Sequence, residues 1–383
     1  MSGTRKDFLA FGKPDFGDAE IEALTGVMRS GWVGMGSEVI ALGRELQDYL
    51  GGPHVVTVST CTSALFLSLV AHGVGAGDEV VCPSLTWCST ANVALYLGAK
   101  PVFCDIDADT LCATPATVKA ALTARTRAVI VVHFGGCAAD IDAIRAVLPL
   151  GVALIEDAAH ALGGRYANGE MVGSSTNLSC FSFYANKNLS TGEGGAIALR
   201  DAAMADRIRS LRLHALPIDA WKRYTNPKSL LLSNKITELG YKMNFTDLQA
   251  CIGRVQLRRQ PEFNARRLAI AQRYAERLAG VKDLKIQSQA TAAHHARHLF
   301  LVQLPLERMR MDRDDFVLEM RTKNIGASIH YAPLHQMPLY GETGLCLPVT
   351  EEVARRSVTL PIGASMTIED TDYVIDQIKE VLA

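Results

Sequence analysis

The sequence lacks a surplus of charge of either sign, because its 39 lysines and arginines nearly balance its 40 aspartates and glutamates. This balance argues against a nucleic acid or an anionic membrane as a partner. Long apolar runs are also missing: the richest, Ala64–Ala71, is far shorter than the ~20 residues needed to span a bilayer. The N-terminal segment has no apolar stretch typical of a signal peptide, so we expect a soluble, cytoplasmic protein.

Cysteine pairs at metal-binding or redox spacing are missing as well. The nine cysteines are odd in number and include no Cys-x-x-Cys pair, which argues against a disulfide framework or a zinc ribbon. We expect them to be reduced and to act as small hydrophobic residues. The run His294-His295-Ala296-Arg297-His298 has no accompanying carboxylate or cysteine pattern, so it predicts a solvated loop and no metal site.

Short β-branched runs alternate with segments of helical length over the first half of the chain. The runs are almost entirely apolar and do not alternate between apolar and polar residues, as in strands buried on both faces of a mostly parallel sheet. They cover residues 54–58, 79–82, 101–104, 128–132 and 152–155. This pattern is typical of an α/β fold, whose ligands lie beyond the carboxyl ends of the strands.

Helix signals mark both ends of this region. Ser37 is the expected N-cap of a helix with Val39, Leu42, Leu46 and Leu50 on one face, ended by Gly51-Gly52. Thr246-Asp247-Leu248-Gln249 has the capping-box form, and the helix that it starts, with Leu248, Ile252 and Val255, is broken by Pro261.

Residues after this helix predict a second, smaller domain. A long charged helix is expected over about 264–278, an apolar strand over 299–302 and a helix over 312–323. We therefore expect a large α/β domain with an N-terminal arm over 1–250 and a small α+β domain over 251–383.

Four motifs stand at or just after predicted strand ends. The first, Val58–Ala64, joins a strand to a helix through small hydroxyl residues, whose free N–H groups and helix dipole favour a phosphate. An ordinary N-cap accounts for it equally well. In the second, Trp87 follows a strand and can stack on a planar cofactor ring, although a core position is the commoner role.

The third and fourth motifs carry an acid and an amine. Asp157 directly follows a buried strand, where it can keep a pyridine nitrogen protonated as an electron sink or simply cap a helix. His160 can contact the phenolic oxygen of such a ring or be a satisfied core histidine. Lys187 lies between apolar strands, where burial favours the neutral amine that forms a Schiff base. Taken alone, it could simply be a solvated lysine in a turn. Together the four motifs favour a pyridoxal phosphate site.

The order and spacing of these motifs resemble the DegT/DnrJ/EryC1/StrS family of PLP-dependent sugar aminotransferases. The similarity extends over nearly the whole chain, in segments 30–34, 83–87, 156–160, 181–195, 240–250 and 330–331. It implies the fold type I, aspartate-aminotransferase-like architecture and a homodimer with shared active sites. The implied cofactor is pyridoxal phosphate, which passes through the pyridoxamine form.

The resemblance assigns roles to matching positions. Lys187 is the Schiff-base lysine, Asp157 the partner of the pyridinium, Trp87 the stacking ring and His160, where many members have glutamine, the contact of the phenolic oxygen. The phosphate contacts are Thr62, Ser63, Ser182 and, from the partner subunit, Lys242 and Asn244. The common residues at these last two positions are asparagine and arginine, so which of them meets the phosphate stays open. Cys61 stands where glycine is frequent, so the phosphate loop can approach differently.

The resemblance also has implications for the substrates. His330, Tyr331 and His335 would line a sugar pocket, and Lys222 and Arg223 would meet a diphosphate. L-Glutamate is the implied amino donor and a nucleotide-linked keto-sugar the acceptor, with 4-keto-6-deoxy sugars favoured, in the biosynthesis of O-antigen or of glycosylated metabolites. Lys187 argues against the related dehydratases, which have histidine there. The alternatives are an aminotransferase of a free cyclitol or another keto-acceptor, and a non-catalytic PLP-binding regulator.

Overall fold

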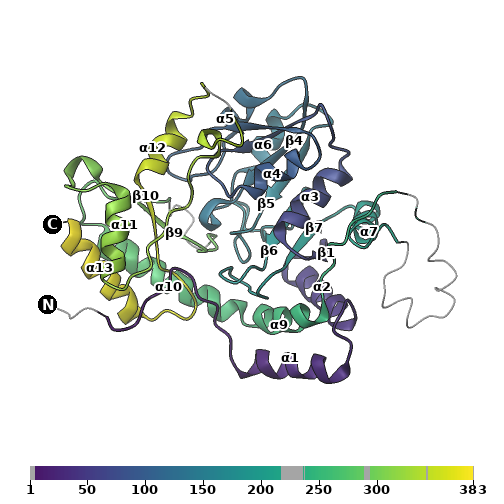
Figure 1. Cartoon of the computed structure of the whole chain (residues 1–383), viewed down its shortest axis with the longest axis horizontal. Helices are drawn as coiled ribbons and strands as arrows, with labels where there is room; N and C mark the ends of the chain where they lie inside the picture. Colours follow the sequence, from purple (N-terminus) through teal and green to yellow (C-terminus); the bar gives the residue numbers. More distant parts are fainter. Residues whose placement is uncertain (1–4, 217–235, 237, 289–293, 342–343, 383) are drawn as a thin grey trace.

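The computed structural model describes residues 5–216, 236, 238–288, 294–341 and 344–382. Within them, a seven-stranded sheet has the strand order β1-β7-β6-β5-β4-β2-β3 (Figure 1). Its strands are β1 His54–Val58, β2 Glu79–Pro83, β3 Lys100–Cys104, β4 Thr126–Val132, β5 Ala153–Asp157, β6 Leu178–Ser182 and β7 Gly195–Leu199. The expected strand runs are confirmed, with small shifts at their ends.

Most of this sheet is parallel, and only β7 runs antiparallel to its neighbours β6 and β1. Strands β2, β5, β6 and β7 are buried along their whole length, which is why their sequences are largely apolar rather than alternating. The register pairs Val132 with Asp157 and Asp157 with Cys180. The carboxyl ends of β4, β5 and β6 therefore lie side by side.

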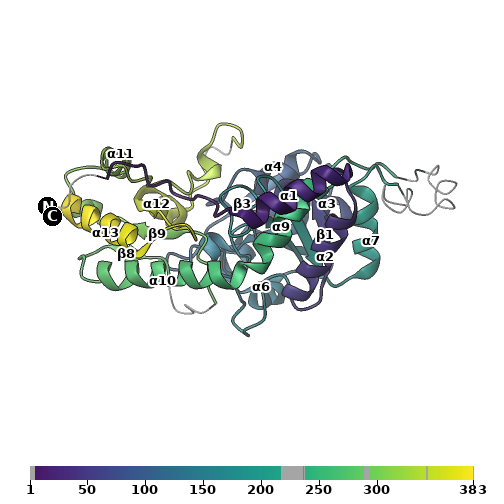
Figure 2. The ribbon, with the colours of Figure 1, turned by 90° about the horizontal axis from the view of Figure 1, so that it is seen from below.

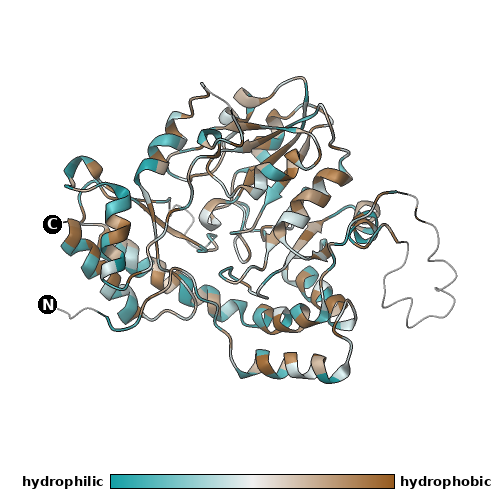
Figure 3. Ribbon diagram, in the orientation of Figure 1, coloured by the Kyte–Doolittle hydropathy of each residue, from teal (hydrophilic) through white to brown (hydrophobic). Residues whose placement is uncertain are grey.

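Helices cover both faces of the large sheet. One face packs against α3 Cys61–Ala71, α4 Ser89–Leu95 and α7 Ala202–Leu211, and the other against α2 Ser37–Tyr49, α5 Pro115–Ala121 and α6 Ile141–Val147. Each face has its own hydrophobic cluster, so the domain has three layers. Figure 3 shows the strands as mainly hydrophobic, whereas hydrophobic and hydrophilic residues alternate along the helices.

Helix α2 begins with a cap that comes from a distant segment. Its N-cap is Gly36, which has no side chain to offer, so the prediction of Ser37 as the cap was wrong. The Asp247 carboxylate instead accepts hydrogen bonds from the backbone N–H groups of Gly36 at 2.8 Å and Val39 at 3.0 Å. The predicted apolar face of α2 is buried as expected.

Thr246 caps helix α9 Asp247–Arg258 through the capping box that the sequence predicted. Val255 on this helix is buried, whereas Leu248 and Ile252 are half-buried. Pro261 lies in the first turn of the following helix α10, Gln260–Leu278, which therefore starts earlier than expected. Proline is tolerated there because the first N–H groups of a helix have no partner within it.

The C-terminal part of the chain contains a three-stranded antiparallel sheet in the order β10-β9-β8. Its elements are β8 Lys285–Ile286, β9 Phe300–Gln303, α11 Arg313–Thr322, α12 Pro348–Arg356, β10 Ser357–Leu360 and α13 Ile368–Leu382. Helices α10, α11 and α13 share a third hydrophobic cluster with this sheet, at the left of Figure 1. The strand and helix predicted over 299–302 and 312–323 are confirmed as β9 and α11.

Short 3-10 turns complete the described elements, namely η1 Phe134–Gly136, η3 Leu306–Arg308 and η4 Leu334–Gln336. Helix α9 packs on α1 Asp18–Ser30 and α2, whereas α10 packs on α13. The domain boundary near residue 250 thus falls within α9 and stays a prediction. None of the helices described here is long and apolar enough to cross a membrane.

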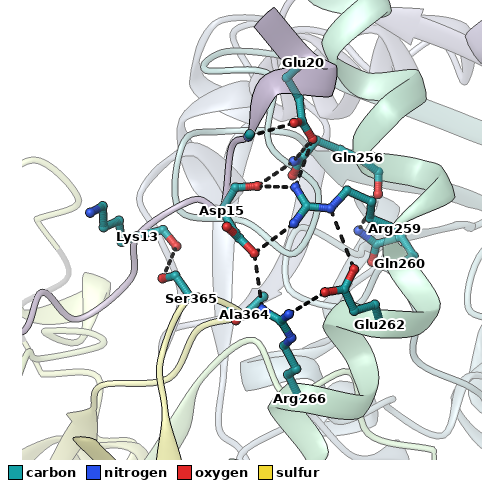
Figure 4. Close-up of polar contacts among 11 residues, drawn as sticks. Lys13, Asp15, Glu20, Gln256, Arg259, Gln260, Glu262, Arg266, Ala364 and Ser365 are labelled. Atoms are coloured by element: carbon teal, nitrogen blue, oxygen red, sulfur yellow. Dashed lines mark hydrogen bonds and ion pairs between the residues drawn. The ribbon is translucent and has the colours of Figure 1, made fainter.

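The N-terminal arm, residues 5–16, runs from the small sheet domain to α1 (Figure 2). It is fastened where α9 meets α10, because Arg259 donates to the backbone oxygen of Asp15 at 2.8 Å and pairs with the Asp15 carboxylate at 3.0 Å. Arg266 donates to the Ala364 oxygen at 3.0 Å. The hydroxyl of the next residue, Ser365, donates to the backbone oxygen of Lys13 in the arm at 3.4 Å (Figure 4). The arm therefore joins α9 and α10 to the small domain.

Candidate active site

A cavity of about 530 Å³ opens at the carboxyl ends of β4, β5 and β6, where the α/β architecture places ligands. The loop from β1 to α3, the residues after β2 and the segment at 330–331 complete its wall. Of the residues singled out in the sequence, the lining includes Thr62, Trp87, Asp157, His160, Ser182, Lys187, His330 and Tyr331. The fold thus brings together side chains that are far apart along the chain.

Asp157 is the last residue of β5, and its carboxylate is buried at the floor of the cavity. It accepts hydrogen bonds from Thr90 Oγ1 at 2.8 Å and from the Ala159 N–H at 3.2 Å. Burial raises the pKa of Asp157 above its ordinary value, although these donors and the nearby Lys187 charge lower it in part. Thr90, which also lies 3.0 Å from Thr86 Oγ1, was missed in the sequence, where only its place shortly after Trp87 hints at a role.

Lys187 extends into the cavity from the loop between β6 and β7. Burial lowers the pKa of its ammonium group to about 8, against the opposing effect of the Asp157 carboxylate. A substantial fraction of the amine is therefore neutral near pH 8, as a nucleophilic lysine requires. The neighbouring Asn188 fixes the loop, because its amide donates to the backbone oxygens of Ala296 at 2.7 Å and Leu162 at 3.2 Å.

His160 is a neutral hydrogen-bond donor to the cavity. Burial, aided by the Lys187 charge, lowers its pKa well below the ordinary value. The Gly135 N–H donates to its Nδ1 at 3.3 Å, so the ring proton must be on Nε2. Nε2 in turn lies 3.3 Å from the hydroxyl of Tyr331. This arrangement directs an N–H group at whatever oxygen lies beside Tyr331.

Trp87 forms an open wall at the cavity mouth, not a part of the core. Its side chain is 60% exposed, and its ring centre lies 5.7 Å from that of Tyr331. A planar ligand can therefore stack on its face.

In the loop between β1 and α3, some hydroxyl residues cap the helix and another lines the cavity, where it could bind a phosphate. Thr60 is the N-cap of α3 and accepts a hydrogen bond from the Ser63 N–H at 3.0 Å. The Ser63 hydroxyl lies 2.9 Å from both Thr60 Oγ1 and Ser59 Oγ, and it is not part of the cavity lining. Thr62 and Ser182 do line the cavity near this helix N-terminus, where an anion is favoured.

Other predicted residues lie outside this cavity. Lys242 hydrogen-bonds to Asn244, which pairs with Val58 on β1, and neither lines the cavity of its own chain. His335 is buried between Ser84 Oγ at 2.7 Å and the Glu351 carboxylate at 3.1 Å, so it links β2 to the start of α12 and does not line the cavity. Lys222 and Arg223 lie outside the described residues.

His298 was missed, and the prediction of a solvated loop around it was wrong. The side chain is buried, with Nε2 3.3 Å from Lys187 Nζ and its ring centre 4.5 Å from that of His160. The loop is drawn inward because the backbone N–H of Ala296 bonds to the turn at Gly136. Only its position just before an apolar strand could have pointed to this. In the described part of the chain, no cluster of histidines, cysteines and carboxylates could hold a metal ion.

Pyridoxal phosphate is the cofactor that the resemblance implies, and the side chains of this cavity fit it. Asp157 offers a buried carboxylate for the ring nitrogen, His160 an N–H for the phenolic oxygen and Trp87 a face for the ring. Thr62 and Ser182 offer hydroxyl groups for the phosphate, and Lys187 an amine of lowered pKa.

Comparisons with known proteins agree with this site. The model of the DegT/DnrJ/EryC1/StrS aminotransferase family matches residues 14–379. The spore coat polysaccharide biosynthesis protein SpsC of Bacillus subtilis (strain 168) is 39% identical, over 100% of this chain and 99% of that protein. The aminotransferase TlmJ of Streptoalloteichus hindustanus has a TM-score of 0.88 and 34% identity, over 98% of each chain.

A further solved protein, Spr1654 of Streptococcus pneumoniae, is known in a PLP form and a PMP form, the pyridoxal and pyridoxamine phosphate states. Both match with a TM-score of 0.88 and 29% identity over 98% of each chain. The protein is therefore a pyridoxal phosphate-dependent sugar aminotransferase and belongs to the DegT/DnrJ/EryC1/StrS family.

Proposed function

We propose that this enzyme transfers the amino group of L-glutamate to a nucleotide-linked keto-sugar, with 4-keto-6-deoxy sugars as the favoured acceptors. The observation that carries the transamination itself is the placement of Lys187, with a pKa of about 8, in one cavity with the buried carboxylate of Asp157. The relative SpsC, named for polysaccharide biosynthesis, supports a sugar as the acceptor.

The residues of this cavity divide the chemistry among them. When bound, pyridoxal phosphate supplies an electron sink for the carbon that bears the transferred nitrogen. Asp157 would keep a proton on the ring nitrogen, because a buried carboxylate charge stabilises a cation beside it, and the hydrogen bond from Thr90 fixes its position. Lys187, as the neutral amine, takes a proton from the substrate carbon and later returns it. His160, whose Nδ1 accepts from the Gly135 N–H, would donate from Nε2 to the ring oxygen.

His330 and Tyr331 are proposed to contact the sugar. Nδ1 of His330 lies 2.8 Å from Thr359 Oγ1, which leaves Nε2 available to the cavity that the residue lines. Burial lowers the pKa of His330 to about 3, so it acts as a neutral group. A neutral imidazole and a tyrosine hydroxyl suit the hydroxyl and carbonyl groups of a sugar. Lys222 and Arg223 remain proposed contacts of the diphosphate.

The charge of the cavity supports a homodimer with shared active sites. Among the described residues that line it, Lys187 is the only lysine or arginine, and this amine is needed for the chemistry. A phosphate and an anionic donor require further cations. Lys242 is exposed, next to Asn244, and does not line the cavity of its own chain. We therefore propose that Lys242 and Asn244 of the partner subunit complete the phosphate site.

The experiment is a two-step assay of the purified holoenzyme. L-Glutamate alone should convert the bound cofactor to the pyridoxamine form, seen by absorbance, with 2-oxoglutarate released. A panel of acceptors then follows by mass spectrometry: nucleotide-linked 4-keto-6-deoxy sugars, the same sugars as 1-phosphates, and free keto-cyclitols.

We expect an aminated product only with the nucleotide-linked acceptors. Equal amination of the free cyclitols or of the 1-phosphates would contradict the proposed acceptor and favour the cyclitol alternative. If no amino donor produced the pyridoxamine form, a non-catalytic regulator would become the better interpretation.

A further inference from the structure

His298 contacts the amine of Lys187 directly, yet none of the roles assigned above uses it. Its Nε2 lies 3.3 Å from Lys187 Nζ, the histidine is buried and the lysine is half-buried in the cavity wall. We propose that His298 is a positioning residue that holds the free amine of Lys187 whenever that amine is not bonded to the cofactor. This inference rests on the proposed transamination, in which the lysine is released and must then move protons at a defined place.

The loop that carries His298 is fixed on both sides. Backbone N–H groups of Ala296 and Leu299 donate to the oxygens of Gly136 at 2.9 Å and Gly135 at 3.0 Å. Asn188, next to Lys187, donates to the Ala296 oxygen at 2.7 Å. The contact between the histidine and the lysine is therefore anchored at both ends.

Close approach of this loop requires glycine at position 136. Gly136 has a φ of +105°, and a Cβ there would lie 3.0 Å from both the Arg297 nitrogen and the His160 oxygen. A side chain at this position would therefore push away the segment that places His298.

The protonation of His298 suits a partner for an amine that changes charge. Burial lowers the pKa of His298 well below its ordinary value, and the nearby Lys187 charge lowers it further, so the ring stays neutral. No hydrogen-bond partner of Nδ1 is present among the described residues, whereas His160 has its tautomer fixed by Gly135. The proton of His298 is thus free to occupy either nitrogen.

This freedom lets one side chain serve both states of Lys187. Toward the ammonium, Nε2 accepts a hydrogen bond while the ring proton is on Nδ1. Toward the neutral amine, Nε2 can carry the proton and donate to the nitrogen lone pair. Because the ring itself does not take the charge, Lys187 remains the group that carries the proton.

Several other groups face Lys187 and must be considered in any pH measurement. Burial lowers the pKa of the lysine, and the Asp157 carboxylate raises it. Burial raises the pKa of the Cys61 thiol well above its ordinary value, so this group faces Lys187 without a charge. His160 and His330 are neutral because burial lowers their pKa values. Loss of the acceptor at position 298 should therefore lower the pKa of Lys187 further, because neither of these neutral histidines takes over its hydrogen bond with Lys187 Nζ.

The test compares His298→Leu, which removes the acceptor, with His298→Gln, which keeps a hydrogen-bonding group. His295→Gln is the matched control, because His295 is half-buried in the same loop and its Nδ1 accepts from the Arg297 N–H at 2.9 Å instead of contacting Lys187. Each full-length protein is loaded with pyridoxamine phosphate, so that the lysine amine is free. Its labelling by acetic anhydride is then followed against pH by peptide mass spectrometry.

We expect the labelling midpoint of Lys187 to fall by about one pH unit in His298→Leu, since a hydrogen bond to a charged group has that effect. His298→Gln should stay close to the wild type, and His295→Gln should not change. The single-turnover rate with L-glutamate should fall in the leucine variant and be largely restored in the glutamine variant.

Two results would overturn the proposal: an unchanged midpoint in His298→Leu, or an equal shift in all three variants, which would indicate a structural role of the loop. If His298→Leu does not fold, an unchanged midpoint and rate in His298→Phe would overturn it equally. The labelling needs no sugar, so it is independent of the acceptor. Conversely, a wild-type protein that forms no pyridoxamine phosphate with any amino donor would refute the proposed function and leave the labelling result standing.

Discussion

Asp157→Asn separates the charge of the buried acid from its hydrogen bonds. Oδ1 of asparagine can still accept from the Ala159 N–H. Its amide can donate to Thr90 Oγ1, which can then turn its own proton toward Thr86, 3.0 Å away. The substitution therefore removes a negative charge from the cavity floor and leaves the local packing almost intact.

The loss of charge should act in opposite directions on folding and on cofactor binding. Burial raises the pKa of folded Asp157, so its ionised form opposes folding once the pH exceeds the ordinary aspartate value of about 4. Cofactor-free Asp157→Asn should therefore unfold at a higher temperature than the wild type at pH 8, and the difference should vanish in acid. Cofactor binding should weaken roughly ten- to a hundredfold, because a hydrogen bond to a charged group contributes about 1.5–3 kcal/mol.

Thermal unfolding of the cofactor-free protein at several pH values and equilibrium titration with pyridoxal phosphate measure both effects. Asp247→Asn is the matched control, since burial also raises the pKa of Asp247 but its carboxylate caps α2 outside the cavity. It should leave cofactor affinity unchanged. Wild-type cofactor affinity in Asp157→Asn, or a lower unfolding temperature at pH 8, would refute the reasoning.

Three further predictions concern the turn at Gly136, the N-terminal arm and the amine of Lys187. Gly136→Ala should lower the free energy of unfolding by about 1–3 kcal/mol, because of backbone strain and contact with the facing loop. Denaturant unfolding measures this loss. In the control Gly151→Ala, which is also at positive φ but faces open space, the loss should be smaller. Arg259→Met should remove the contacts that hold Asp15 of the N-terminal arm, so that limited proteolysis cleaves the arm faster while helicity stays constant. Equal cleavage rates would contradict this. In the cofactor-free protein, acylation of Lys187 should rise with pH to a midpoint near its pKa of about 8. A midpoint near that of free lysine would show that burial has no such effect.

Features that depend on neighbouring residues were predictable from the sequence. The continuous apolar runs gave the strands because burial on both faces leaves no polar side. Asp157 could be placed at the edge of the sheet because it directly follows one of these runs. The capping box at Thr246 was equally predictable, because both of its hydrogen bonds join residues within a stretch of four.

Features that depend on distant contacts were not predictable in this way. The cap of α2 comes from Asp247, which no local pattern around Ser37 reveals. His298 is buried because its loop bonds to the glycines of η1, far away in the sequence. Thr90 becomes a partner of Asp157 only when the residues after β2 fold beside β5. In each case, a backbone or side-chain group from another helix, strand or turn decides the role.

The central claim is that Lys187 is the amine that carries pyridoxal phosphate. Borohydride reduction of the holoenzyme fixes the cofactor to the amine that holds it, and peptide mass spectrometry then locates the modified residue. The account predicts a single pyridoxyl group on Lys187 and none in a Lys187→Ala protein. Modification of another lysine, or a Lys187→Ala protein with the cofactor absorbance and turnover of the wild type, would contradict it.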